Sequence, residues 1–468
     1  MKITGQTEIL SIIESQRAFF KAGNTLNTRF RKKMLKQLLT AVVQYEERLA
    51  KALWSDLHKS YEEAYLTEIS IVKGEIKAHL KNLTKWARRE SVHTPVKLAP
   101  SKSYIVKEPL GNTLIISPWN YPVQLLLCPL VGAISSGCTT VLKPSPYVPE
   151  VSAAIEEMIT EFFPKEYIAV VQGHRDVNTT LLEQRWDLIF FTGSPALGKS
   201  VMAAAAKNLT PVILELGGKS PCIVDSSANI GIAAKRIAWG KTLNSGQTCI
   251  APDYILIHKD VKEQFISAFK KAIETLHTSK SSANSIFPDS HYVHIVNDKA
   301  FERLTGYLKE GDIIYGGEFD AASRVIHPTL LDNVAPDAKV MTDEIFGPIF
   351  PIITLDDNGK PFKESVIEFV NNREKPLALY YFGRESEGWD IIRNTSSGGG
   401  CINDVIMHIA NDKLPFGGVG NSGMGRYHNR ESFECFSHTR SILVTGTWID
   451  LPFRYMPYKL FKLVKKLL

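Results

Sequence analysis

Short apolar runs alternate with helical segments along the first half of the chain. Residues 34–53 carry apolar side chains three and four positions apart, which predicts amphipathic helices within residues 1–89. From residue 112 the alternation becomes regular. The expected strands are 112–116, 139–142, 168–172, 188–191 and 212–216, and the expected helices are 123–135, 150–161, 177–184 and 197–207. This order predicts a parallel, doubly wound α/β sheet, in which ligands bind at the carboxyl ends of the strands.

The alternation restarts near residue 219 and predicts a second α/β domain. Its first expected strands are 222–225 and 254–258, and its first expected helices are 230–243 and 261–277. A glycine-rich segment at 417–425 ends this domain.

An uncharged stretch at 109–142 exceeds the ~20 residues that a membrane helix needs. Pro118, Pro122 and Pro129 interrupt it, so we interpret it as strand, loop, buried helix and strand. Residues 1–22 carry several charges and lack the apolar core of a secretory signal peptide.

Composition narrows the class of protein. The 468 residues suggest two or three domains, and contents of 44% hydrophobic and 22% charged residues are typical of globular proteins. Six cysteines in such a chain favour free thiols in a reducing, cytoplasmic compartment over a disulfide framework. The net charge is +6, but no long basic block precedes the C-terminal tail, so nucleic acid is not an expected partner.

Three glycine-containing segments invite comparison with phosphate-binding loops. The segment 418–423 fits the dinucleotide pattern but does not follow a strand, and 218–220 lacks the first glycine of a P-loop, so neither is expected to bind phosphate. The segment 190–198 joins an expected strand to an expected helix. Its glycines would let backbone amides and the positive helix end approach a pyrophosphate, although an ordinary strand-to-helix turn has the same pattern.

Three side chains are candidates for chemistry. Cys249 ends Asn-Ser-Gly-Gln-Thr-Cys, where glycine and small polar residues leave a nucleophilic sulfur accessible. Glu215 ends a strand and precedes two glycines, and a carboxylate in a dry pocket can act as a general base. Asn120 follows another strand, and its amide can donate to an oxyanion. Each of them, taken alone, is also compatible with a structural role. Cysteines in apolar runs are expected to be buried: Cys128, Cys138 and Cys222.

A series of motifs, in the same order along the chain, resembles the aldehyde dehydrogenase superfamily. The motifs are Pro-Trp-Asn-Tyr-Pro (118–122), Lys-Pro-Ser (143–145), Phe-Thr-Gly-Ser (191–194), Glu-Leu-Gly-Gly-Lys (215–219), Gly-Gln-Thr-Cys (246–249), Glu-Ile-Phe-Gly-Pro (344–348) and Pro-Phe-Gly-Gly (415–418). Further segments are similar to the class 3 branch, which includes enzymes for fatty, aromatic and medium-chain aldehydes: 403–408, 423–425, 427–428, 436–438 and 454–458.

The resemblance implies the α/β aldehyde dehydrogenase fold, with a Rossmann-like cofactor domain, a catalytic α/β domain and a β oligomerisation arm. Residues 1–216 would form the cofactor-binding domain, with 91–107 in the arm, and 217–420 would form the catalytic domain. Residues 421–447 would return to the cofactor domain and the arm, and 448–468 would form an amphipathic tail. A homodimer is the implied assembly.

The resemblance also implies NAD(P)-dependent oxidation of aldehydes, of medium or long aliphatic or aromatic kind, to carboxylic acids. Cys249 would attack the aldehyde, while Asn120 and the main-chain N–H of Cys249 stabilise the oxyanion. After hydride transfer to the nicotinamide, Glu215 would activate the water that hydrolyses the thioester. No metal ion is implied.

NAD or NADP is the implied cofactor. The residues implied to bind it are Lys143 and Ser145 near the adenosine ribose, Gly193, Ser194 and Gly198 at the pyrophosphate, and Leu216, Gly217, Glu344 and Phe346 near the nicotinamide ribose and ring. The family often has a glutamate after Lys-Pro-Ser, which accepts from the ribose 2′-hydroxyl. Pro146 stands there instead, so we expect NADP to be accepted.

The alternative reaction is that of a CoA-acylating aldehyde dehydrogenase, in which CoA and not water takes the acyl group; the water-activating Glu215 argues against it. A cysteine acyltransferase or hydrolase would not need the nucleotide features at Lys143 and Glu344. A binding scaffold without activity would be expected to have lost Cys249 or Glu215.

The last residues, 458–468, place leucine and valine on one face of a helix and lysines largely on the other. This pattern predicts a helix that lies in a membrane interface over anionic lipid. Packing on a neighbouring subunit, over the substrate tunnel, is the alternative, and the two are compatible. The segment is too short to span a membrane.

Overall fold

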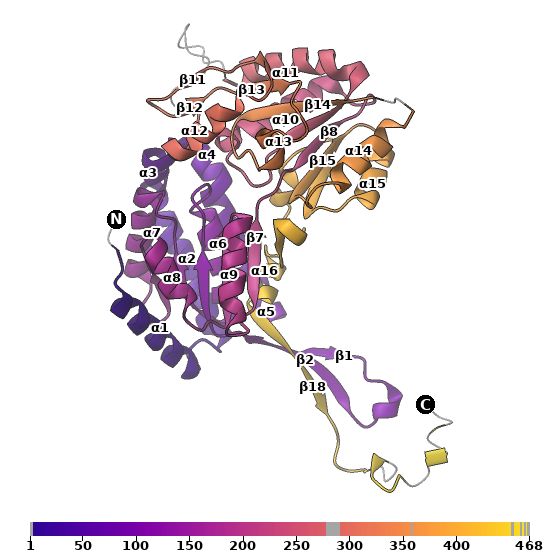
Figure 1. Ribbon diagram of the computed structural model, residues 1–468. Helices are drawn as coiled ribbons and strands as arrows, with labels where there is room; N and C mark the ends of the chain where they lie inside the picture. Colours follow the sequence, from indigo (N-terminus) through magenta and orange to yellow (C-terminus); the bar gives the residue numbers. More distant parts are fainter. Residues whose placement is uncertain are drawn as a thin grey trace.

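The computed structural model describes residues 3–277, 291–356, 359–450, 454–458, 461–462 and 465. Figure 1 shows two α/β lobes, one above the other, and a narrow β arm that projects from the lower lobe.

The lower lobe is built on a six-stranded sheet in the order β17-β7-β6-β3-β4-β5. Its parallel strands are β3 (Asn112–Ile116), β4 (Thr139–Lys143), β5 (Ile168–Val170), β6 (Leu188–Gly193) and β7 (Val212–Leu216). The short β17 (Gly423–Met424) pairs antiparallel with β7, so a late segment of the chain forms this edge. Strands β3 and β4 are buried along their whole length, as expected for parallel strands that are covered on both faces.

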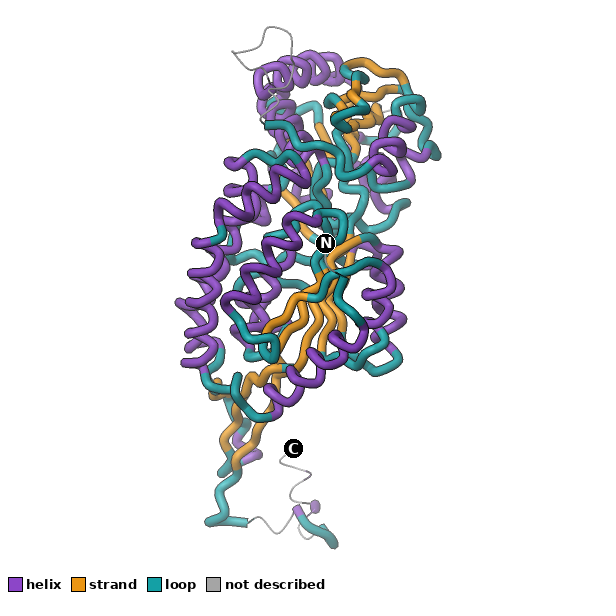
Figure 2. Tube along the Cα trace, turned by 90° about the vertical axis from the view of Figure 1, so that its left-hand side faces the viewer, coloured by secondary structure: helices purple, strands orange, loops and turns teal. Residues whose placement is uncertain are grey.

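Helices cover both faces of this sheet (Figure 2). Those that follow its strands are α6 (Gln124–Ser136), α7 (Pro149–Phe162), α8 (Arg175–Leu182) and α9 (Pro195–Ala206). The N-terminal helices are α1 (Gln6–Lys21), α2 (Thr28–Gln44), α3 (Glu46–Leu57), α4 (Tyr61–Ala64) and α5 (Ser70–Trp86), with the π-helix η1 (Tyr65–Ile69) between the last two. Helices α2, α5 and α16 (Arg430–Cys435) pack against the fully buried α6.

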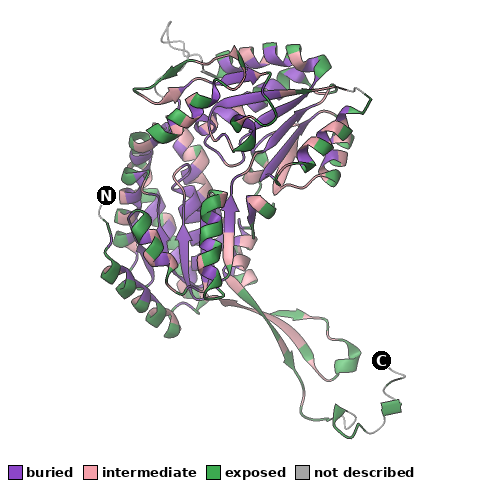
Figure 3. Ribbon diagram, in the orientation of Figure 1, coloured by how far each residue is buried: buried purple, intermediate pink, exposed green. Residues whose placement is uncertain are grey.

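The upper lobe contains a seven-stranded sheet in the order β10-β13-β14-β9-β8-β15-β16, parallel except for the edge pair β10 and β13. The strands are β8 (Pro221–Val224), β9 (Tyr254–His258), β10 (Asp312–Tyr315), β13 (Thr329–Asp332), β14 (Ile349–Leu355), β15 (Ala378–Phe382) and β16 (Gly399–Ile402). A small hairpin joins β11 (Phe319–Asp320) to β12 (Val325–Ile326). The helices are α10 (Ile230–Thr242), α11 (Lys262–His277), α12 (Asp298–Tyr307), α13 (Lys339–Thr342), α14 (Phe362–Asn371) and α15 (Glu385–Asn394). Figure 3 shows that the buried residues of both lobes concentrate on the sheets and the helix faces that cover them.

The arm is a three-stranded antiparallel sheet in the order β1-β2-β18. It joins β1 (Glu90–Val92) and β2 (Lys102–Pro109) to the late strand β18 (Ser437–Val444). In contrast to the lobes, the residues of β1 and β18 are mostly exposed.

These elements confirm the predicted α/β fold class. Each strand and helix expected between residues 112 and 277 is present within a few residues of its predicted bounds, including the strand, loop, buried helix and strand of 109–142. The helical pattern at 34–53 is divided, because α2 ends and α3 begins at Tyr45. In the described part of the chain no helix is both long and apolar enough to cross a membrane. Most of the predicted tail helix at 458–468 lies outside the described residues.

Candidate active site

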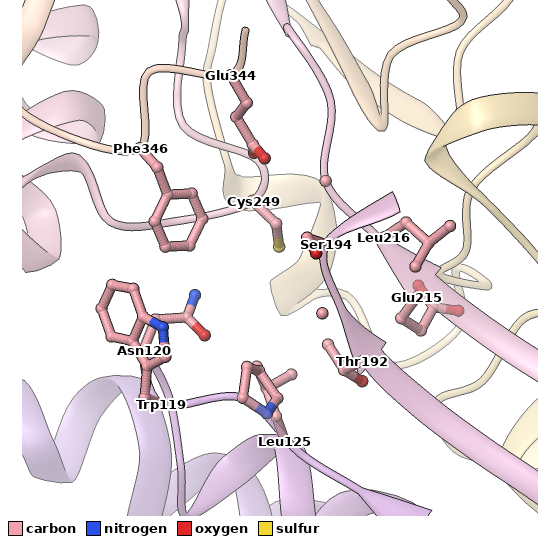
Figure 4. A pocket seen from close by; sticks show the side chains of 13 residues that line it. Trp119, Asn120, Leu125, Thr192, Ser194, Glu215, Leu216, Cys249, Glu344 and Phe346 are labelled. Carbon is pink, nitrogen blue, oxygen red and sulfur yellow. The ribbon is translucent and has the colours of Figure 1, made fainter. Parts of the chain in front are cut away.

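One pocket lies between the two lobes and gathers most of the predicted site residues (Figure 4). The loop after β3, the start of α6 and the carboxyl ends of β6 and β7 with the residues that follow them form its lower wall. Segments of the upper lobe before β9 and β14 form its upper wall. The lining residues are Pro118, Trp119, Asn120, Leu125, Thr192, Gly193, Ser194, Glu215, Leu216, Gly217, Cys249, Glu344 and Phe346. The pocket therefore sits at the carboxyl ends of parallel strands, where the alternation of strands and helices predicts it.

Cys249 is half-buried, and its sulfur points into the pocket (Figure 4). The three residues Asn244, Ser245 and Gly246 ahead of it all have positive φ angles, of 52°, 51° and 72°. This conformation is strained for Asn244 and Ser245, which are not glycine; it is stable only where the surroundings hold it, and it concentrates at active sites. Here the main-chain N–H of Asn244 donates to Glu63 at 2.9 Å.

The environment of Cys249 does not stabilise a thiolate. Burial raises the pKa of the Cys249 thiol, and the nearby carboxyl groups of Glu344 and Glu215 raise it further, while main-chain N–H groups lower it slightly. The protonated thiol therefore dominates at neutral pH, and a base must remove its proton before the sulfur attacks.

Glu215 is the last residue but one of β7, and only 3% of its surface is exposed. Within the described part of the chain, neither carboxyl oxygen has a hydrogen-bond partner. Burial alone raises the pKa of Glu215 well above its ordinary value. A carboxyl group with these properties can exchange a proton with a bound water near neutral pH, which a solvated glutamate does poorly.

Asn120 lies on the loop between β3 and α6, and its side chain is 2% exposed. Its Nδ2 donates to the carbonyl oxygen of Gln247 at 3.0 Å, so one amide hydrogen connects the Asn120 loop to the Cys249 loop. A second connection joins the hydroxyl groups of Tyr121 and Thr248 at 2.7 Å. The remaining Nδ2 hydrogen of Asn120 is available for an oxyanion in the pocket.

Glu344 and Phe346 reach the pocket from the segment before β14. Burial, followed by the charge of Asp253, raises the pKa of Glu344 to about 8, and the N–H of Gly218 opposes this shift. A Cβ atom at Gly217 would lie 2.0 Å from a Glu344 carboxyl oxygen, so a larger residue there would displace this carboxylate. The ring of Phe346 packs edge-on against Trp119, with centroids 5.4 Å apart.

The strand-to-helix turn after β6 has the form expected of an anion-binding turn. Ser194 is the N-cap residue of α9, and its hydroxyl accepts from the N–H of Leu197 at 3.4 Å. Gly193 lines the pocket, whereas Gly198 lies within α9 and packs where a Cβ would be 2.7 Å from Leu216. Gly198 therefore acts through close packing of α9 on β7 and does not line the pocket.

Lys143 is the last residue of β4 and Ser145 follows it, and neither lines this pocket; β4 lies one strand further from β7 than β3. Lys143 is buried and its Nζ donates to the carbonyl oxygen of Pro144 at 2.8 Å, while burial lowers its pKa to about 8. The hydroxyl of Ser145 accepts from the N–H of Tyr147 at 3.3 Å. Their predicted contact with the adenosine end of a cofactor stays a prediction.

A nicotinamide nucleotide fits the residues that are present. Oε1 of Glu344 is buried and has no partner among the described residues, so it offers an acceptor for a ribose hydroxyl. The helix end at Ser194 offers N–H groups to a phosphate, and Trp119 and Phe346 offer apolar surface to a ring. Among the described residues, no cluster of histidine, cysteine, aspartate and glutamate could hold a metal ion.

The sequence interpretation did not assign roles to Thr192, Trp119 and Leu125, which also line the pocket. Thr192 and Trp119 belong to the motifs at 191–194 and 118–122, and these motifs could have indicated them. Leu125 looks like any apolar residue of a buried helix. In the glycine-rich segment at 417–425, a Cβ at Gly418 would lie 2.0 Å from the Ser422 carbonyl oxygen, so this glycine allows close packing of the main chain.

The model of the aldehyde dehydrogenase family matches residues 2–442. The chain is 45% identical over 464 residues to the 4,4'-diaponeurosporen-aldehyde dehydrogenase of Staphylococcus aureus, which covers 97% of this chain and 99% of that relative. It is 42% identical over 454 residues to the dimeric NADP-preferring aldehyde dehydrogenase of Canis lupus familiaris, covering 96% and 98%. A solved structure described as the substrate-bound state of Staphylococcus aureus AldH is similar with a TM-score of 0.94 and 44% identity, and 100% of each chain is covered.

Proposed function

Because this chain belongs to the aldehyde dehydrogenase family of NAD(P)-dependent enzymes, we propose that it oxidises aldehydes to carboxylic acids through an acyl group on Cys249. The observation that carries the proposal is the convergence of Cys249, Asn120 and Glu215 on one pocket from two loops and the end of strand β7. The three residues supply a nucleophile, an oxyanion donor and a general base.

In the first half-reaction the thiol proton of Cys249 passes to solvent water, and the sulfur then forms a bond to the aldehyde carbon. The carbonyl oxygen becomes an oxyanion, to which Asn120 donates its free Nδ2 hydrogen and Cys249 its main-chain N–H. A bound nicotinamide ring supplies the acceptor for the hydride that leaves the carbon. The thioester that remains is held on Cys249.

In the second half-reaction Glu215 takes a proton from water, and the oxygen of that water attacks the thioester carbon. The same donors stabilise the second oxyanion. The carbon–sulfur bond then breaks and the carboxylic acid leaves, and the proton taken up by Glu215 returns to the Cys249 sulfur, which restores both groups. The unpartnered carboxyl oxygens of Glu215 support this role, because they are free to bind a water.

For the cofactor, Glu344 would hold the nicotinamide ribose, with Phe346 beside the ring, and Gly193 and Ser194 would face the pyrophosphate. Lys143 and Ser145 would lie near the adenosine ribose. Since Pro146 replaces an acidic residue there, a 2′-phosphate would meet no like charge at that position, which supports the use of NADP as well as NAD.

Medium-chain, long-chain or aromatic aldehydes are the proposed substrates. The apolar side chains Trp119, Leu125 and Phe346 in the pocket wall support this class. One relative is named for the aldehyde of diaponeurosporene.

A homodimer in the cytoplasm is the proposed state of the protein. The outer edge of β18 lies at the side of the arm sheet, and its residues Leu443 and Val444 are each 50% exposed. An open edge strand with apolar side chains is a natural surface for a second copy. One relative is named as dimeric. The tail at 458–468 would contact anionic lipid or the neighbouring subunit, as its sequence pattern suggests.

Steady-state kinetics across aldehyde chain lengths, with NAD and NADP and with or without CoA, test this function. We expect cofactor reduction without CoA, and its loss in Cys249→Ala. Cys401→Ala is the matched control, since Cys401 is also half-buried but lies outside the pocket. Retention of more than a few per cent of kcat in Cys249→Ala, or an absolute need for CoA, would contradict the proposal.

A further inference from the structure

A fully buried ion pair lies behind the active-site loops. The Nζ of Lys59 is 2.6 Å from Oε1 of Glu68, and both side chains have 0% of their surface exposed. A buried ion pair contributes little net stability, because the cost of removing two charges from water offsets their attraction. The role of this pair therefore lies in its contacts with other groups more than in its own contribution to stability.

Both members of the pair hold the loop that carries Asn120. The Nζ of Lys59 donates to the main-chain carbonyl oxygen of Asn120 at 3.1 Å and lies 4.3 Å from the centre of the Tyr121 ring. Oε2 of Glu68 accepts from the N–H groups of Val123 and Gln124, at 2.8 and 3.3 Å. The pair thus fixes the carbonyl at one end of the 120–124 turn and the N–H groups at the other.

Glu68 caps the N-terminus of α6 from outside that helix. Val123, at the N-cap of α6, makes no side-chain capping bond, so a carboxylate from another helix satisfies the first N–H groups. Glu68 stands on the π-helix η1, a rare helix form that often occurs at functional sites.

The same carbonyl group joins the nucleophile loop to this support. Nδ2 of Asn244 donates to the carbonyl oxygen of Asn120 and to that of Gln247, each at 3.0 Å. Since Nδ2 of Asn120 also donates to Gln247, the Asn120 peptide and the Asn120 amide are fixed in one network.

We propose that Lys59 and Glu68 are positioning residues that orient the Asn120 amide towards the oxyanion of the reaction. The proposal rests on the oxyanion role of Asn120 proposed above. Without Lys59 the Asn120 carbonyl loses its charged donor, and without Glu68 the start of α6 loses its cap. The free Nδ2 hydrogen would then point in several directions instead of one, and misplacement by about 1 Å can cost about a hundredfold in rate.

The test is a double-mutant cycle on the full-length protein. One arm is Lys59→Met/Glu68→Gln, which removes both charges together, and the other is Asn120→Ala. We expect each arm to lower kcat/KM by about tenfold or more. In the Asn120→Ala background, the pair variant should cost less than about threefold further, because no amide is left to orient.

A second readout separates orientation from general damage. Alkylation of Cys249 by iodoacetamide forms no oxyanion, so its rate should stay within about twofold in the pair variant. Should the pair variant not fold, Lys59→Arg keeps the charge but changes the donor geometry, and the same lack of additivity is expected. Lys262→Met is the matched control, because Lys262 forms a 2.6 Å ion pair with Asp332 that joins α11 to β13.

The outcomes distinguish the two proposals. If Asn120→Ala leaves kcat/KM unchanged, the oxyanion role is wrong and this inference fails with it. If Asn120→Ala impairs the enzyme but the pair variant is fully additive, or slows alkylation as much as it slows oxidation, the positioning role alone is overturned.

Discussion

Two kinds of buried glutamate lie close to the catalytic loops, and their surroundings differ. Glu215 faces the pocket with both carboxyl oxygens unpartnered among the described residues, and burial raises its pKa. Glu68 lies behind the loops with an ion pair and two main-chain N–H donors. A buried carboxylate without partners costs stability and gains reactivity, whereas a paired one fixes the backbone. The same change, glutamate to glutamine, should therefore mainly lower turnover at Glu215 and mainly lower stability at Glu68.

The largest expected effect is on turnover at Glu215. We expect Glu215→Gln to lower steady-state kcat by about 10²–10⁴-fold, because no base remains to activate water. The first turnover of cofactor reduction, measured by stopped-flow absorbance, should stay close to that of the unmodified enzyme. A parallel loss of both rates would show that Glu215 acts before the thioester forms.

The next effect is on stability at Glu68. Glu68→Gln leaves the buried charge of Lys59 unpaired, so we expect a loss of about 3–5 kcal/mol in the apparent free energy of unfolding, measured by denaturant titration. Glu368→Gln is the control, since Glu368 and Lys360 form an exposed pair that should contribute little to the free energy of unfolding. Equal losses in the two variants would remove the distinction between the buried and the exposed pair.

A smaller effect is the pH dependence of stability at Glu215. The pKa of Glu215 in the folded protein lies above the ordinary value of 4.5. The stability that the protonated carboxyl group contributes is therefore complete below pH 4.5, and it is lost as the pH rises towards the pKa of the folded state. Glu215→Gln removes this loss. We expect the melting temperature of the variant, relative to the unmodified protein, to rise by about 1–4 °C between pH 5 and pH 8. A relative decrease over this range would mean that Glu215 has an ionic partner.

The smallest effect concerns a carboxylate added at Pro146, where it would be neither buried without partners, as Glu215 is, nor held in a buried ion pair, as Glu68 is. Pro146 is half-buried, so a glutamate there can stay hydrated and should act on the ligand and not on the fold. We expect Pro146→Glu to raise the KM for NADP relative to that for NAD by about tenfold, because the 2′-phosphate would meet a like charge. An unchanged ratio of the two KM values would place the 2′-phosphate elsewhere.

The sequence was sufficient for the fold class and for most of the pocket. Strands that end at 116, 193 and 216 could be placed from their apolar runs, and parallel strands bring their carboxyl ends together. Asn120 and Glu215 follow from this rule, and Cys249 from its glycine-containing loop.

The supporting pair could not be found in this way. Lys59 and Glu68 are charged residues in a helical region, where a solvated surface position is the usual expectation. Their burial depends on the contact of η1 with the loop before α6, and no local pattern encodes that contact. Gly198 and Lys143 show the same limit, because only the tertiary packing determines that neither lines the pocket.

The most direct test of the account is the mass of the acyl-enzyme. Glu215→Gln is mixed with a medium-chain aldehyde and NADP, quenched in acid after one turnover, and measured as the intact protein and as peptides. We expect the mass of one acyl group on the peptide that contains Cys249, and no adduct in Glu215→Gln/Cys249→Ala. An adduct on another cysteine, or cofactor reduction with no adduct at all, would contradict it.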